Sequence, residues 1–342
     1  MSDLKDRIYG TLIGVAAGDA LGMPSSMMSP QMIKSTFNKY IEDFLPAPEG
    51  HIIHNNMVAG EITDDTQQTL IIADSLIEKK KVDPEDIAWR LIKWAESINA
   101  FESLVLGPST LRSLYAIKSG RAISEAGAVG DTNGAAMKIS PVGIFGMGDM
   151  EKTIDAVSLA CLPTHNTNIA IAGAAAVAIA IGTGLLGETN VDIIVERALE
   201  AVDHGMDKGK IWFGASITER TRLALNIIEK HTDLAATMRE LYEVIGAGVA
   251  ITETVPLCLA VVKLADADPV KAITINTNLG GDCDTTSSIA GAICGAIAGA
   301  GAFPPQWIEK LEEVNHLNLK RYADNLHELV CKNQNAREEL IR

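Results

Sequence analysis

Aromatic residues are scarce in this sequence. Phe, Trp and Tyr together make up 4% of the 342 residues, although hydrophobic residues make up 47%. Most of the hydrophobic content is therefore aliphatic, and alanine and glycine are abundant. A β-sandwich uses aromatic and β-branched side chains, and no segment here alternates apolar and polar residues as a half-buried strand does. The composition predicts closely packed helices.

Positive charge is also in short supply. The chain has 29 Lys and Arg against 44 Asp and Glu, which gives a formal net charge of −15. The basic run Lys79-Lys80-Lys81 is short and is typical of a solvated helix end. Nucleic acids and anionic membranes require a basic surface that replaces their counterions. We therefore expect no nucleic acid and no membrane among the partners.

Paired cysteines are lacking, and no leader segment is expected. The five cysteines form no C-x-x-C motif, and the first ten residues carry four charged side chains ahead of a short apolar stretch. We expect a reduced, cytoplasmic protein. The apolar run from Ile169 to Leu186 is long enough to span a membrane but is rich in alanine and glycine, as is 289–302. Both runs predict buried core helices.

Helical periodicity covers most of the chain. Residues 4–22 predict an apolar helix, whereas 24–59 contain four prolines and predict irregular structure or short pieces. A helix is predicted from Thr66, and residues 127–148 hold six glycines and a strong turn signal at 131–134. Further helices are predicted at 87–97, 111–118, 151–161, 167–186, 190–204, 216–230, 234–246, 254–266, 269–277, 285–300, 305–316 and 317–341. The fold class is therefore all-α, a compact multi-helix bundle.

Two Asp-Thr clusters stand out, Ile-Thr-Asp-Asp-Thr at 62–66 and Gly-Gly-Asp-Cys-Asp-Thr-Thr at 280–286. Each lies at a predicted helix start beside apolar sequence, where uncompensated charge is costly. Capping a helix explains one or two of these residues, not all of them. Four carboxylates are neutralised by two divalent cations, so we predict a shared centre of two Mg²⁺ or Mn²⁺ ions, bridged by Asp284. Sharing one site would make residues 1–342 a single domain.

A glycine-rich loop at 130–137 supplies a second candidate element. Its backbone N–H groups are suited to a phosphate or a ribose, although a tight connection between helices explains the same residues. His165 lies two residues after a proline and just before an apolar helix, where an ordinary capping contact would explain it. Glu253 is either a site carboxylate or an ordinary residue of a helix start.

The order of the motifs resembles the ADP-ribosylglycohydrolase family over residues 7 to about 310. The matching segments are Gly18-Asp19-Ala20-Leu21-Gly22, Gly60-Glu61-Ile62-Thr63-Asp64-Asp65-Thr66, Gly107-Pro108-Ser109-Thr110, Thr132-Asn133-Gly134-Ala135-Ala136-Met137-Lys138, Pro163-Thr164-His165 and Gly280-Gly281-Asp282-Cys283-Asp284-Thr285. The resemblance implies an all-α enzyme with a binuclear Mg²⁺ or Mn²⁺ site that hydrolyses an N- or O-glycosidic bond.

Site residues follow from the same resemblance. The metal ligands it implies are Thr63, Asp64, Asp65, Asp282, Asp284 and Thr285. The candidate substrate-binding residues are Asn133, Gly134, Met137 and His165. We predict that a metal-activated water attacks the substrate and that its proton goes to Asp65, or that Asp19 assists; helix capping explains Asp19 equally well. The expected substrate is a small ribosyl compound or an ADP-ribosylated protein.

Three positions depart from the family pattern. Ser26 replaces a glutamate that many members carry, Val105 replaces an aspartate found in arginine-directed members, and Lys138 replaces the usual arginine. The first two departures remove acids that would help with a guanidinium-linked substrate. They leave a nucleoside or nucleotide N-ribohydrolase as an alternative. A catalytically silent crystallin-like protein is a further alternative, although the retention of every metal-ligand position argues against it. The leaving group, the physiological ion and the oligomeric state are left open.

Overall fold

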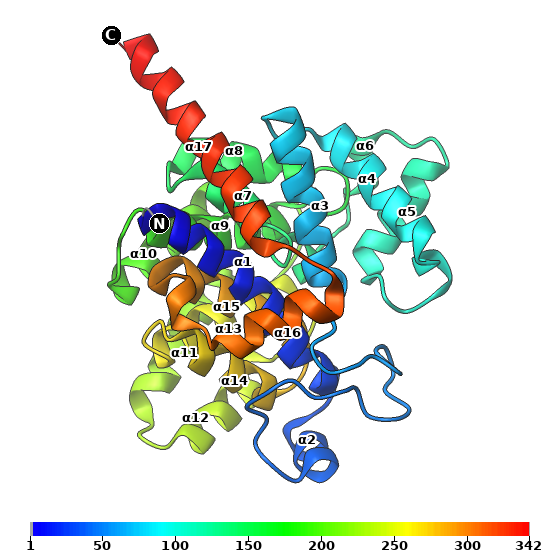
Figure 1. Cartoon of the computed structure of the whole chain (residues 1–342), viewed down its shortest axis with the longest axis vertical. Helices are drawn as coiled ribbons and strands as arrows, with labels where there is room; N and C mark the ends of the chain where they lie inside the picture. The colour runs from blue at the N-terminus through cyan, green and yellow to red at the C-terminus, as the bar shows by residue number, and fades with distance from the viewer. Residues whose placement is uncertain (1–2, 342) are drawn as a thin grey trace.

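The computed structural model describes the backbone of residues 3–341 and the side chains of residues 3–333. Helices arranged in several layers make up this structure (Figure 1). The described backbone contains no β-strand, and isolated β-bridges join loops at Met28 and Gly281, Thr132 and Ala250, and Thr167 and Lys210. The all-α prediction is confirmed.

The α-helices have the following bounds: α1 Asp3–Gly22, α2 Pro30–Phe37, α3 Asp64–Lys79, α4 Pro84–Ser97, α5 Pro108–Lys118, α6 Ile123–Ala126, α7 Ser140–Gly146, α8 Met150–Cys161, α9 Asn168–Leu185, α10 Val191–Gly205, α11 Ile217–Lys230, α12 Leu234–Glu240, α13 Ile251–Leu264, α14 Pro269–Leu279, α15 Cys283–Ala298, α16 Pro305–Asn315 and α17 Leu319–Ile341. Short 3₁₀ turns lie at Met23–Ser25, Ala100–Glu102, Asn133–Ala135 and Ala300–Ala302, and a π-helical turn lies at Leu241–Ile245.

Three elements differ from the sequence-based predictions. The glycine-rich span 127–148 contains the helix α7, which was not expected there. The predicted helix at 234–246 changes to π-helical geometry at Leu241. Helix α13 begins at Ile251, three residues earlier than predicted, so Glu253 lies in its first turn and accepts a hydrogen bond from Gly248 N at 2.9 Å. This contact gives Glu253 a role in holding the preceding loop.

Helices α1 and α15 pack backbone against backbone at the centre of the molecule (Figure 1). Glycines recur every four residues along one face of α1, and a Cβ atom on any of them would lie 2.0–2.5 Å from a backbone atom of α15 or the turn after it; they are Gly10, Gly14, Gly18 and Gly22. Residues four apart share a helix face. The glycine spacing therefore allows the close approach that places the end of α1 beside the start of α15.

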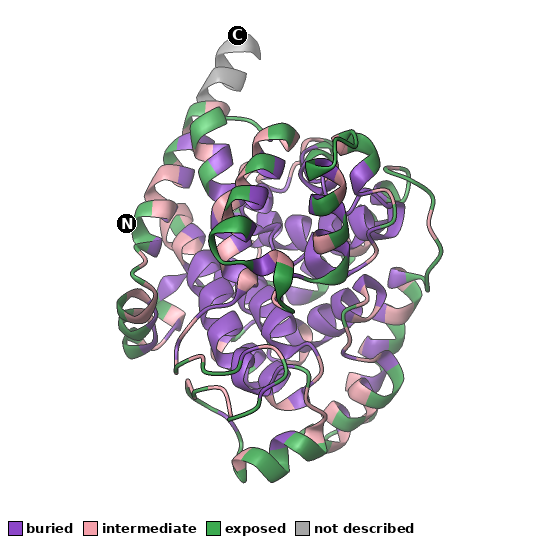
Figure 2. Cartoon of the chain, turned by 90° about the vertical axis from the view of Figure 1, so that its right-hand side faces the viewer, coloured by how far each residue is buried: buried purple, intermediate pink, exposed green. Residues whose placement is uncertain are grey.

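Helix α9 is the one helix in the described structure that is long and apolar enough to cross a membrane. Every one of its residues, Asn168 to Leu185, is buried by neighbouring helices. Buried residues are concentrated in the central helices, and exposed residues lie on the outer ones (Figure 2). This agrees with the prediction of a core helix, because alanine and glycine permit close packing on every side.

Candidate active site

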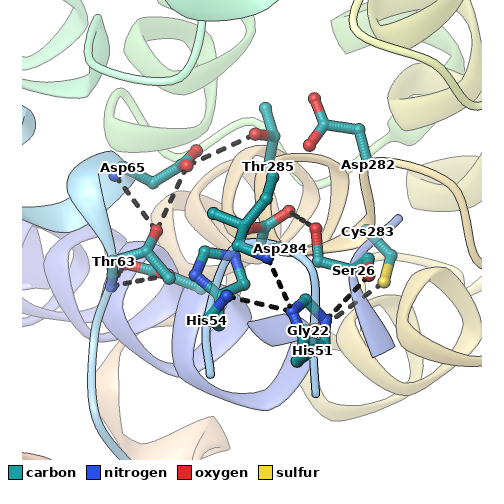
Figure 3. A network of polar contacts seen from close by, with 12 residues as sticks. Gly22, Ser26, His51, His54, Thr63, Asp65, Asp282, Cys283, Asp284 and Thr285 are labelled. Atoms are coloured by element: carbon teal, nitrogen blue, oxygen red, sulfur yellow. Dashed lines mark hydrogen bonds and ion pairs between the residues drawn. The ribbon is translucent and has the colours of Figure 1, made fainter. Parts of the chain in front are cut away.

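The two Asp-Thr clusters meet at the N-terminal ends of α3 and α15. Thr63 is the N-cap of α3, with its Oγ1 accepting a hydrogen bond from Asp65 N at 3.3 Å, and Asp282 precedes the first residue of α15. Thr285 Oγ1 donates to Asp65 Oδ2 at 3.3 Å, although 220 residues separate them (Figure 3). The structure thus brings together residues that only their composition linked in the sequence.

Asp19 holds the first cluster in place from the last turns of α1. Its carboxylate accepts hydrogen bonds from the backbone N–H groups of Thr63 and Thr66, at 3.0–3.1 Å, and from Thr66 Oγ1 at 2.5 Å. It is fully buried and is not among the residues that line the adjoining pocket. Every contact described for Asp19 therefore positions the start of α3, and its part in proton transfer stays a prediction.

A pocket of about 420 Å³ opens above the clusters. The carboxylates of Asp64, Asp65, Asp282 and Asp284 line it together with Thr285. The remaining lining comes mainly from the 103–111 segment, from Thr132, Asn133, Gly134 and Met137, and from Met27, Ile52, Ile53, His54 and Val249. Among these lining residues there is no lysine and no arginine. The pocket therefore combines an acidic end with a largely apolar remainder.

The clustered carboxylates repel one another. Burial raises the pKa of Asp64 to about 7, and the facing charges of Asp284 and Asp19 add to the effect. Burial and the other carboxylates raise the pKa values of Asp65 and Asp282 well above the usual range. Buried like charges are costly unless a cation compensates them. The acidic end therefore has a strong electrostatic preference for positive charge.

The donor set fits oxygen-preferring divalent ions. Asp65 Oδ1 is buried without a hydrogen-bond partner, and the neighbouring donors are carboxylates and hydroxyls, which Mg²⁺ and Mn²⁺ prefer. In the part of the chain that the structure describes, no three His, Cys, Asp or Glu side chains already surround one point as a complete ligand set. Cys283 bonds to Gly22 O and Ser25 Oγ, away from the pocket. The prediction of divalent ions is therefore supported by the chemical type of the available ligands, not by a complete coordination shell.

Asp284 is held by two residues that sequence reasoning did not assign to the site. Ser26 Oγ donates to Asp284 Oδ1 at 2.7 Å, and His54 Nε2 lies 3.0 Å from Asp284 Oδ2 (Figure 3). Burial alone would raise the pKa of Asp284, but the hydrogen bond and charge of His54, together with hydrogen bonds of Ser26 and Asp282, lower the pKa to about 2. The sequence placed two histidines in an irregular segment, and nothing local linked them to residue 284.

Asn133 connects the glycine-rich loop to the second cluster. Its backbone N–H donates to Val249 O at 2.9 Å, and its Nδ2 donates to Asp282 Oδ2 and, at 3.1 Å, to Thr254 Oγ1. Both hydrogen bonds of the side-chain amide are made to protein groups. Asn133 lines the pocket, but its described hydrogen bonds orient Asp282.

His165 lies beneath the same loop rather than in the pocket. Its Nε2 contacts Thr132 Oγ1 at 3.0 Å, its Nδ1 contacts Thr164 Oγ1 at 2.8 Å, and burial lowers its pKa well below the usual value. A Cβ atom on Gly134 would lie 2.8 Å from the His165 ring, so only glycine fits there. Gly134 and Met137 line the pocket, whereas His165 supports the loop from behind. The substrate contacts themselves stay predictions.

Lys138 is fully buried next to the first cluster. Its Nζ donates to Gln68 Oε1 and Thr164 Oγ1, both at 3.2 Å, and Gln68 Nε2 donates to Asp64 Oδ2 at 2.8 Å. Burial lowers the pKa of Lys138 to about 8, although Asp64 and Asp65 favour its charged form. Lys138 lies behind the pocket and does not line it. Its positive charge can therefore balance part of the charge of the carboxylates without contacting a bound substrate.

Known proteins resemble this chain over nearly its whole length. A family model described as ADP-ribosylglycohydrolase matches residues 1–336. The uncharacterized protein YegU of Escherichia coli K12 is 39% identical over 323 residues, which cover 94% of this chain and 96% of YegU. A solved structure described as an ADP-ribosylglycohydrolase-related protein complex has a TM-score of 0.67 at 23% identity, covering 96% of this chain and 100% of the other. That similarity shows the fold.

Several relatives carry the name of an activity. ADP-ribosylhydrolase ARH3 of Gallus gallus is 26% identical over 359 residues, which cover 95% of this chain and 94% of the relative. The ADP-ribosyl-dinitrogen reductase glycohydrolase of Rhodospirillum rubrum is 26% identical over 334 residues, which cover 94% and 96%. The chain therefore belongs to the ADP-ribosylglycohydrolase family and is a hydrolase that acts on glycosyl bonds.

Proposed function

We propose that this enzyme uses two Mg²⁺ or Mn²⁺ ions to hydrolyse the glycosidic bond of an ADP-ribosyl or smaller ribosyl compound, free or attached to a protein. One observation carries the proposal. Carboxylates from α3 and α15 converge at one end of a pocket, where Asp65 Oδ1 is buried without a partner. The names of the ADP-ribosylhydrolase relatives support the substrate class.

Six residues would hold the ions, namely Thr63, Asp64, Asp65, Asp282, Asp284 and Thr285. When bound, the ions would supply Lewis acidity, which orients ribose hydroxyls and lowers the pKa of a bound water. Asp19, Asn133 and Lys138 keep this group in place, since each contacts a cluster residue or the residue bonded to one. The protein thus orients most of the acidic side chains before substrate arrives.

The protein's own contribution to the chemistry centres on Asp65. Hydrolysis forms a bond from the water oxygen to the anomeric carbon and breaks the bond to the leaving group, through an oxocarbenium-like state. Asp65 Oδ1 accepts the proton that the water loses, and burial among the other carboxylates raises the pKa of Asp65, which strengthens it as a base. The proton that Asp65 accepted then passes to the leaving group, directly or through solvent, so that one water is added across the broken bond and Asp65 is regenerated.

A hydrolysis screen tests this proposal. ADP-ribosyl-arginine, ADP-ribosyl-serine, O-acetyl-ADP-ribose and free nucleosides would be incubated with the enzyme in Mg²⁺, in Mn²⁺ and in EDTA. We expect release of the ribosyl product from at least one compound, with activity lost in EDTA and in Asp284→Ala, which should still fold. Full activity of Asp284→Ala would refute the two-ion mechanism.

A neutral leaving group is the second candidate, and the rest of the pocket favours it. Leu104 and Val105 line the pocket where an acid for a guanidinium would be useful, and Leu104 is 67% exposed. Ser26 uses its hydroxyl on Asp284. A buried cationic group without a partner is costly, whereas a nucleobase fits apolar walls. A nucleoside or nucleotide N-ribohydrolase would have these features.

Val105→Asp tests the role of the apolar wall. A carboxylate there should improve the rate on ADP-ribosyl-arginine relative to a neutral substrate by about tenfold or more, since a hydrogen bond to a charged group contributes about 1.5–3 kcal/mol. The measurement is the ratio of kcat/KM for the two substrates. Val105→Asn is the matched control, because asparagine has the shape of aspartate without its charge. An equal gain in both variants would count against an electrostatic cause.

A further inference from the structure

The long segment between α2 and α3, residues 38–62, carries two buried histidines. His51 is 6% exposed and His54 is 4% exposed, whereas Ile52 between them is 68% exposed. Histidine and isoleucine normally show the opposite tendency. Burial of a polar ring in an irregular segment requires specific hydrogen bonds, and these two rings have them.

His51 organises the turn that presents His54. His51 Nδ1 accepts hydrogen bonds from Ile53 N at 3.2 Å and from His54 N at 3.0 Å, and His51 Nε2 lies 3.0 Å from Ser26 O. A carbonyl oxygen only accepts, so Nε2 carries the hydrogen and Nδ1 is the acceptor. One tautomer of the neutral ring satisfies all three contacts.

The contacts close into a ring of four residues. Asp284 bonds to the Ser26 hydroxyl, the Ser26 carbonyl accepts from His51, His51 accepts from the backbone of His54, and the His54 side chain returns to Asp284 (Figure 3). The rings of His51 and His54 also stack, with centroids 5.1 Å apart. Ser26 therefore acts at two points of the ring. Its hydroxyl contacts Asp284 Oδ1, and its carbonyl holds His51, which in turn holds the backbone of His54.

From this ring we infer that His54 is a positioning residue for the metal centre, acting through Asp284, and that its loop is fastened over the pocket by the same contact. The inference rests on the proposed two-ion function. A carboxylate has about four lone-pair sites, and one donor on each oxygen leaves two sites for ions. Ser26 and His54 thus fix the plane of the carboxylate while leaving it free to bridge. Ile52 and Ile53, which also line the pocket, belong to the same turn as His54, and Ile53 N donates to His51 Nδ1 as His54 N does.

Metal affinity tests the positioning role without any substrate. Titration calorimetry with Mn²⁺ alone would compare wild type, His54→Ala, His54→Gln and His204→Ala. His54→Ala should bind about 10–100-fold more weakly, as is typical when a group that orients a ligand is lost. His54→Gln keeps an N–H donor and should recover most of the affinity. His204 is exposed on α10, so His204→Ala should bind as wild type does.

Hydrogen exchange measured in EDTA tests the fastening of the loop independently. Peptides from residues 47–59 should exchange faster in His54→Ala than in wild type, while the α9 peptides remain protected. Wild-type affinity in His54→Ala, or an equal loss in His54→Gln, would overturn the positioning role. Absence of Mn²⁺ binding by wild type would instead refute the metal centre. The exchange data would still show whether His54 fastens the loop. Unchanged exchange in His54→Ala would overturn the fastening of the loop.

Discussion

Asp65 combines an unpartnered carboxylate oxygen with a position among like charges. Its Oδ2 lies near Thr63 and Thr285, whereas its Oδ1 has no hydrogen-bond partner. The unpartnered oxygen contributes no stabilising contact to the folded protein. Such an arrangement is typical of a functional site, where a group is kept available for an ion or a proton at the expense of stability.

Asp65→Asn should separate these two effects. Because asparagine has the same shape without the charge or the base, we expect hydrolysis to fall by about 10²–10⁴-fold, as is usual for loss of a general base. The metal-free variant should unfold at a higher temperature than wild type, since repulsion from Asp64 and its neighbours is relieved. Steady-state kinetics and thermal unfolding in EDTA are the measurements. A variant that is both inactive and less stable would indicate a structural role.

At the scale of helices, the contact between α1 and α15 decides whether the site can form. The two Asp-Thr clusters lie on α3 and α15, and Asp19 at the end of α1 joins the first cluster while Gly22 meets the backbone of Asp284. A wider separation of α1 and α15 would displace Asp19 from α15. Catalytic geometry thus depends on glycines that never contact the pocket.

Gly14→Ala should therefore be strongly destabilising. Its Cβ atom would lie 2.0 Å from Gly291 O, and overpacking of this kind costs about 1–3 kcal/mol or more because rigid backbone must move. Gly301→Ala is the matched control, since its Cβ atom would meet nothing within 4 Å. Urea unfolding of both variants measures the difference. Similar stability of the two would contradict the close helix contact.

At the scale of the whole molecule, buried acids couple stability to pH and to metal. The pKa of Asp19 is raised to about 6 and that of Asp64 to about 7, from the ordinary 3.8. An acid whose pKa is raised by folding stabilises the folded state at a pH below its unfolded-state pKa. This contribution to stability is lost as the pH rises through the folded-state pKa. The pKa of Asp284 is lowered to about 2, so its stabilising contribution is present at neutral pH and is lost only as the pH falls below about 4.

The stabilisation by Mn²⁺ should consequently increase between pH 5 and pH 8. Ions bind the deprotonated carboxylates, so the ion competes with protons at low pH and relieves repulsion at high pH. At about 100 times the Kd, a single bound ion adds about 2.7 kcal/mol at pH 8, and the effect should be small at pH 5. The measurement is the difference in Tm between Mn²⁺ and EDTA across this range. A difference that does not change with pH would argue against binding by these acids.

Much of the architecture could be read from local patterns. Apolar spacing located most of the helices, and Thr63 and the 280–286 turn marked two helix starts. The sequence pattern does not predict helix α7, because six glycines in 127–148 obscure its periodicity. It places the start of α13 too late, because Thr252, Glu253 and Thr254 resemble a polar boundary. Such errors arise where packing overrides local preference.

The acidic residues of the site were recognisable in the sequence, because adjacent carboxylates beside apolar helices are unusual at any position. The contacts among them were not. His54 and Ser26 reach Asp284 across 230 and 258 residues, and Asn133 reaches Asp282 across 149. Periodicity and capping describe neighbours within one or two turns, whereas these hydrogen bonds form only when distant segments pack against the start of α15. Long-range packing therefore assigned the partners that local chemistry left open.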